Sequence, residues 1–185
     1  MQKISTNSRL CGTIKAKTAA TLTAIVCAVL LPQLVHLCAI HSGMGKSLGE
    51  ILLPMHLPVM LVGFLAGPVV GMITGLAAPV ISFALTGMPA AAVLPFMCIE
   101  LMSYGVIAGA LCASKLPSVV KILAVQAGGR AVRALAMLVS FHALGNKSAN
   151  AASFISSVGT GAVGIILQLC VITLTVYILS RRDER

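Results

Sequence analysis

The sequence is poor in charged and aromatic residues. Only 9% of its 185 residues are Asp, Glu, Lys or Arg, whereas soluble domains contain about 25%. Acidic residues number four, Tyr occurs twice and Trp is absent, so any aromatic belts at the membrane interfaces are weak. The scarcity of charge, with 58% hydrophobic residues, excludes an ordinary soluble domain and indicates an integral membrane protein.

The chain also lacks the motifs of common catalytic and metal sites. It contains no Walker A sequence, no HExxH and no GxSxG, so neither P-loop ATP hydrolysis nor hydrolase chemistry has support. The six cysteines form no CxxC pair, and four of them lie in apolar runs, where Cys is a small core residue. We therefore expect no enzymatic activity, no metal site and no cofactor.

Six apolar segments of helical length follow one another along the chain. They predict an all-α fold, a bundle of six transmembrane helices in one domain over residues 18–180. A basic lead (1–17) precedes the domain and a basic tail (181–185) follows it. The second segment is short, about 24 Å as a helix, and Gly67-Pro68 predicts a tight turn after it. The six segments are 18–40, 51–66, 69–85, 92–113, 117–141 and 153–179.

Basic residues gather at the ends of these segments. The net charge of +9 could indicate a nucleic-acid partner, but we reject that reading because the charges flank the predicted spans. With the N-terminus in the cytoplasm, nine Lys and Arg face the cytoplasm, and only Lys46 and Lys147 lie in outer loops. The sequence thus predicts a multi-pass protein of the bacterial plasma membrane with both termini cytoplasmic.

Three ionisable residues lie deep within predicted spans. Glu100 belongs to the fourth span, and Arg130 and Arg133 share one face of the fifth, three residues apart. Their depths suit a pair between Glu100 and one arginine, with Arg133 favoured. The other guanidinium, Arg130, then awaits an anionic group on a ligand, because Arg offers a planar fork for carboxylate. In the alternative, backbone carbonyls, Tyr104 or Gln126 satisfy it structurally.

Two further features have both a structural and a functional interpretation. Ala20, Ala24 and Ala28 form a ridge of small residues that lets another helix approach closely, either within the chain or from a docking partner. His56, near the start of the second span, is either a hydrogen-bonded packing residue or part of a site.

The pattern resembles the substrate-binding S components of energy-coupling factor (ECF) vitamin transporters. The resemblance covers roughly residues 18–180 and rests on MHLPVMLVGFLAGPVVGMITGLAAPVISFALTGMP (55–89), FMCIELMSYGVIAGAL (96–111) and Gly129-Arg130. It implies a binding subunit that works with a membrane scaffold subunit and two ATPases, with the alanine ridge as the docking motif. It also implies an outward-opening pocket formed by helices four to six and by loops 41–53, 86–91 and 142–152. The candidate substrate-binding residues are Arg130, Arg133, Glu100, Tyr104, His56 and, in the last loop, Asn146.

Vitamin uptake is the leading interpretation. An anionic or zwitterionic compound such as pantothenate or folate is favoured over cobalamin or a pyrimidine precursor. The internal Met55-His56 is not at a free amino terminus, which argues against the nickel or cobalt carried by metal-binding relatives. Two alternatives remain, a structural or assembly subunit without a small-molecule ligand and a standalone secondary transporter.

Overall fold

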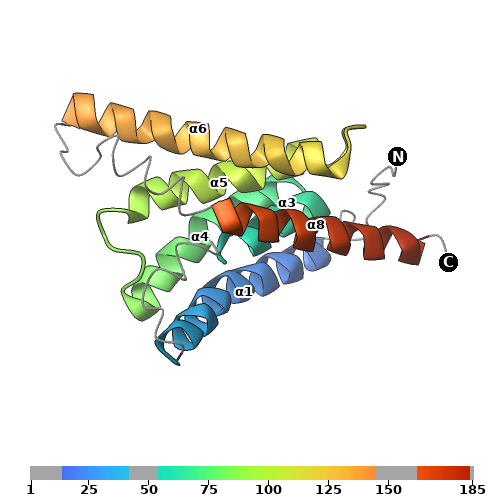
Figure 1. Ribbon diagram of the computed structural model, residues 1–185, viewed down its shortest axis with the longest axis horizontal. Helices are drawn as coiled ribbons and strands as arrows, with labels where there is room; N and C mark the ends of the chain where they lie inside the picture. Colours follow the sequence, from blue (N-terminus) through green and yellow to red (C-terminus); the bar gives the residue numbers. More distant parts are fainter. Residues whose placement is uncertain (1–13, 42–53, 145–161, 184–185) are drawn as a thin grey trace.

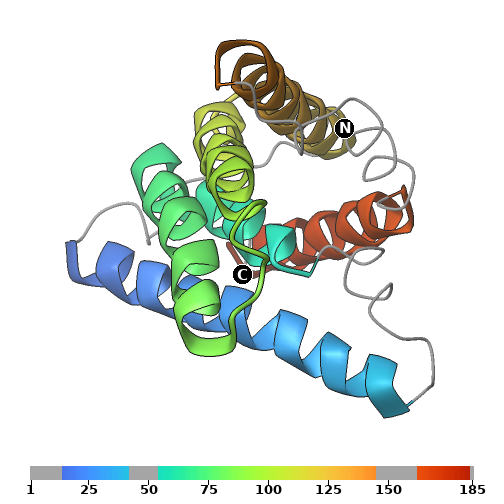
Figure 2. The same cartoon turned by 90° about the vertical axis from the view of Figure 1, so that its left-hand side faces the viewer.

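The computed structural model describes residues 14–41, 54–144 and 162–183, and these residues fold into helices without any strand. The all-helical prediction is therefore confirmed over the described part of the chain. α3 lies at the centre, in contact with α1, α4, α5 and α8, and α5 lies between α4 and α6 (Figures 1 and 2). The helices are α1 (Ile14–His41), α3 (His56–Ala66), α4 (Pro68–Thr86), α5 (Leu94–Leu111), α6 (Ser118–Leu144) and α8 (Ala162–Asp183).

Four of the described helices are long and apolar enough to cross a membrane: α1, α4, α5 and α6. The other two contain shorter apolar segments, His56–Ala66 and Gly164–Thr175. At 1.5 Å per residue, the 11 residues of α3 extend only about 16 Å. Large aliphatic side chains are exposed on the outer faces of the bundle, as expected of surfaces in contact with lipid; examples are Leu22, Leu34, Val69, Leu85, Leu135 and Leu174.

The starts of α1 and α3 differ from the sequence prediction by several residues. α1 begins at Ile14, four residues before the predicted span, so Lys15 is already helical. α3 begins at His56 rather than at residue 51, and Pro54 lies in a turn before it. Starting the helix at His56 puts Pro58 in the first turn, where a missing backbone N–H breaks no intrahelical hydrogen bond. Prolines thus set the start of α3.

The predicted Gly67-Pro68 turn joins α3 to α4. Gly67 has a φ of +96°, which side-chain-bearing residues rarely adopt, and Pro68 opens the next helix, where its fixed φ fits. At the far end of α4, Gly87 has a φ of +70° and donates its N–H to the carbonyl of Phe83 at 2.8 Å. This is the left-handed glycine that commonly ends a helix.

α4 and α5 are in backbone contact through glycines. A Cβ placed on Gly71 would lie 2.5 Å from the carbonyl oxygen of Gly105, and Gly75 faces the backbone of Leu101 just as closely. Gly109 touches Pro68 in the same way. Only glycine permits this approach, and the contacts fix the position of the α5 segment that carries the polar residues described next.

Candidate functional site

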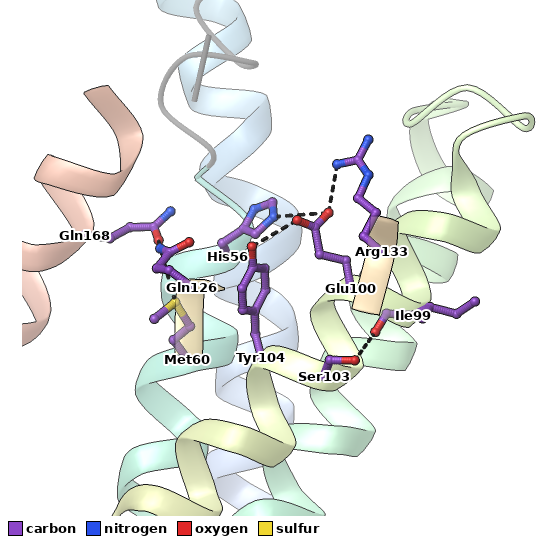
Figure 3. A network of polar contacts seen from close by, with 9 residues as sticks. All are labelled: His56, Met60, Ile99, Glu100, Ser103, Tyr104, Gln126, Arg133 and Gln168. Atoms are coloured by element: carbon purple, nitrogen blue, oxygen red, sulfur yellow. Dashed lines mark hydrogen bonds and ion pairs between the residues drawn. The ribbon is translucent and has the colours of Figure 1, made fainter. Parts of the chain in front are cut away.

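The site is centred on Glu100, in the second turn of α5. Its carboxylate is buried and accepts a hydrogen bond from Nη1 of Arg133 on α6, with 2.8 Å between that nitrogen and Oε2. The hydroxyl of Tyr104, one turn along α5, donates to Oε1 at 2.9 Å. Nε2 of His56, the first residue of α3, lies 3.9 Å from Oε2 (Figure 3). Three helices therefore converge on one carboxylate.

The predicted pair between Glu100 and Arg133 is thus confirmed, and the local sequence explains how the surrounding residues fit. Gly129 on α6 has no side chain, and the ring of Tyr104 occupies the space that a Cβ would need. The Tyr104 ring also meets the His56 ring edge to face, with centroids 5.2 Å apart. Tyr104 is therefore held on both sides, which directs its hydroxyl at the carboxylate.

Arg130 lies one turn before Arg133 on the same side of α6 and is partly buried. It is close enough to the Tyr104 hydroxyl to interact with it electrostatically. Glu100 is the only acidic residue in the sequence from 54 to 144, and its carboxylate is already paired with Arg133. In this part of the chain, the two α6 arginines therefore carry one more positive charge than the single carboxylate can neutralise.

A second group of polar contacts joins α3, α6 and α8. The side-chain amide nitrogen of Gln126 donates to Oε1 of Gln168 and lies 3.7 Å from the sulfur of Met60. Both glutamines are buried. From the sequence, Gln168 had no assigned role and Gln126 was only a possible structural partner for Arg130. The signal that could have found them is the rarity of amide side chains in apolar spans.

Three buried polar atoms have no hydrogen-bond partner among the residues that the structure describes. They are Nδ1 of His56, Oε1 of Gln126 and Nε of Arg133. Most buried polar atoms in folded proteins are paired, and an unpaired one calls for a specific explanation. His56 and Arg133 belong to the group around Glu100, and Gln126 belongs to the group that reaches Gln168 on α8 (Figure 3).

The alanine ridge packs inside the subunit. Ala24 is buried against Val62 and Val70, and Ala28 is fully buried against Val59 and other apolar residues of the core. Ala20 is partly buried at the edge of the same packing. A docking partner could reach Ala24 and Ala28 only if α1 moved, so their burial favours internal packing, and docking through this ridge stays a prediction. The internal alternative explains their size.

Two other features lie apart from the polar network. Asn146, the candidate from the last predicted loop, is outside the described residues. An apolar groove of about 620 Å³ runs along the surface between α5 and α6. Because its walls are apolar except for one serine, it suits contact with lipid rather than recognition of a polar ligand; they are formed by Pro95, Phe96, Ile99, Val132, Leu135, Ala136, Val139 and Ser140.

The arrangement can bind but has no evident chemistry. Among the described residues, no group of His, Cys, Asp and Glu could hold a metal ion. Glu100 is engaged by an arginine and a tyrosine, which suits charge neutralisation within the membrane better than proton relay.

Comparison with known proteins identifies a family. A protein-family model described as ECF transporter, substrate-specific component, matches residues 18–180. No curated protein and no solved structure matches the chain. The matched residues include all the polar residues described above and all of the described helices except the start of α1 and the end of α8.

Proposed function

Because the chain belongs to the family of ECF transporter substrate-specific components, we propose that it captures a vitamin or vitamin precursor outside the cell for ATP-driven import. Members of this family are substrate-binding subunits of membrane transporters and not enzymes. The partners in this proposal are a membrane scaffold subunit and two ATPases. The absence of a Walker A sequence supports this division of labour, since the chain has no P-loop of its own.

The proposed substrate carries an anionic or zwitterionic group, as pantothenate and folate do. The observation that carries this proposal is the charge balance between α5 and α6, where Arg130 and Arg133 are two positive charges and Glu100 is the only acidic residue in the sequence from 54 to 144. Arg133 is paired with Glu100, which leaves Arg130 as the proposed anchor for the substrate's acid. The Tyr104 hydroxyl interacts with Arg130 but is neutral, so it cannot balance the guanidinium charge.

The proposed entry side follows from the distribution of basic residues. Nine Lys and Arg lie at or near the ends of the spans on one side against two on the other, which supports cytoplasmic termini. The network lies at the end of the bundle where α3 and α5 begin. With the termini inside, that end faces the exterior, where a substrate arrives.

Mass spectrometry of the compound that remains bound to the detergent-purified wild-type subunit is the first test. The identified compound is then titrated into wild type, Arg130→Gln and the control Lys115→Gln, which removes an exposed charge. We expect an acid to be found and Arg130→Gln to weaken its binding by about 2–5 kcal/mol, roughly 30- to 4,000-fold. Lys115→Gln should bind normally. A neutral compound bound equally well by wild type and Arg130→Gln would overturn the proposed substrate class.

A further inference from the structure

The side-chain amide of Gln126 uses its nitrogen in hydrogen bonds but not its oxygen. Its nitrogen donates to Gln168 and approaches the sulfur of Met60, whereas its oxygen has no partner among the described residues. The residue is only 4% exposed. A buried amide oxygen without a donor is costly, and in a binding subunit a ligand can supply the missing donor.

The position of Gln126 links it to the proposed anchor. Residues 126, 130 and 133 are spaced four and three apart on α6, so they lie along one face of the helix. Gln126 is about 6 Å from Arg130 along the helix axis. In Figure 3 the amide oxygen of Gln126 is turned toward His56 and away from Gln168. His56 itself has an unpartnered buried Nδ1.

We propose that Gln126 is a specificity-determining residue of the substrate site, whose side-chain oxygen accepts an N–H or O–H group of the substrate. This inference rests on the proposed function, since Arg130 binds the acid of the same molecule. The substrate is then an acid that also carries a hydrogen-bond donor within reach of the Gln126 oxygen. An acid without such a donor leaves the Gln126 oxygen unpaired and binds more weakly.

A purely structural role for Gln126 makes a different prediction. The hydrogen bond between Gln126 and Gln168 joins α6 to α8, so loss of either side chain breaks the same contact. Gln126→Met and Gln168→Met are therefore a matched pair, with thioethers of similar length in both. Only Gln126→Met also removes the unpartnered oxygen. If the hydrogen bond between Gln126 and Gln168 is the only role of Gln126, the two variants bind the substrate with equal affinity.

The test uses pantothenate and folate as probes, because both carry a carboxylate together with N–H or O–H donors. Each is titrated calorimetrically into the detergent-purified full chain as wild type, Gln126→Met, Gln168→Met and Arg130→Gln. We expect at least one probe to bind wild type and Gln126→Met to weaken that binding roughly 5- to 150-fold, the range for one unmade buried hydrogen bond. Gln168→Met should stay within about threefold of wild type.

The possible failures are distinguishable. Equal affinity of Gln126→Met and Gln168→Met, with loss of binding in Arg130→Gln, overturns the role of Gln126 and leaves the proposed function standing. Failure of both acids to bind wild type overturns the proposed substrate class and this inference together. If Gln126→Met does not fold, the double variant Gln126→Met/Gln168→Met is used instead. It replaces both partners of the hydrogen bond with apolar groups, which costs less stability than leaving one partner unpaired. It is then compared with Gln168→Met, and equal affinity again overturns the role.

Discussion

Removing Arg133 from its pair with Glu100 should destabilise the subunit more than removing Glu100 does. Arg133→Met leaves the carboxylate, whose side chain is 4% exposed, with only the neutral Tyr104 hydroxyl and His56 at 3.9 Å. Glu100→Gln leaves a guanidinium on a side chain that is 18% exposed and can move toward water or lipid head groups. We therefore expect Arg133→Met to be the more harmful change.

The geometry sets the magnitude. At 2.8 Å and an effective dielectric constant of about 20, the attraction between the two charges is about 6 kcal/mol. Part of this is offset by the desolvation of both groups, so removing one partner should cost about 3–5 kcal/mol. For a chain of 185 residues this corresponds to a fall in Tm of roughly 6–20 °C. The double variant Glu100→Gln/Arg133→Met has no stranded charge at this pair and should lie closer to wild type than Arg133→Met does.

The assay is thermal unfolding of the detergent-purified subunit, in which the fraction still folded after heating is measured by size-exclusion chromatography. Wild type, both single variants and the double variant form a cycle, from which we expect a coupling free energy of at least about 1 kcal/mol. Lys115→Gln serves as the control for loss of an exposed cation. If the losses in the single variants add up to the loss in the double variant, the 2.8 Å contact is not a stabilising pair and the reasoning fails.

Two further predictions concern packing, and thermal unfolding of the isolated subunit measures both. Gly71→Ala should destabilise by about 1–3 kcal/mol, because its Cβ meets the Gly105 carbonyl at 2.5 Å. Gly128→Ala is the control, since its Cβ meets only the flexible tip of Ile107 and should cost far less; equal losses would show that backbone contact is not what matters. Ala28→Leu should destabilise without any partner present, because Ala28 is fully buried, whereas Val26→Leu on the exposed face should be nearly neutral. A stable Ala28→Leu subunit would mean that the ridge is open to docking after all.

Much of the architecture could be predicted from the sequence, because a membrane forces backbone hydrogen bonds into helices and excludes charge from the spans. The same exclusion made Glu100 and the α6 arginines conspicuous, and similar depth in two neighbouring helices was enough to select Arg133 as the partner. Gly67-Pro68 was equally informative. Glycine can adopt a positive φ, as Gly67 does, and proline has a fixed φ that suits the start of the next helix, so the dipeptide favours a turn.

The direction in which a helix face points could not be predicted in the same way. The ridge of Ala24 and Ala28 has the spacing of a docking motif, yet spacing only shows that a backbone can approach and not whose backbone it is. The contact between Gln126 and Gln168 joins residues 42 positions apart, and nothing local to either residue indicates it. Lys121 shows the same limit, because nothing local in the sequence indicates that it is buried and donates to the carbonyl of Cys112 at the end of α5.

The glycine contacts explain how so small a bundle keeps a polar network in order. Leu101 and Gly105 of α5 touch the α4 backbone, and Glu100 and Tyr104 lie on the same turns of α5. The positions of Glu100 and Tyr104 along α5 are therefore set by contacts between backbones. Such contacts are rigid, because backbone atoms have no alternative side-chain rotamers. A carboxylate and a hydroxyl held in place beforehand need little further ordering when a ligand arrives, and this lowers the entropic cost of binding. The arginines approach from α6, where Gly129 leaves room for the Tyr104 ring. A fixed carboxylate on α5 thus occupies Arg133 and leaves the charge of Arg130 to the proposed ligand.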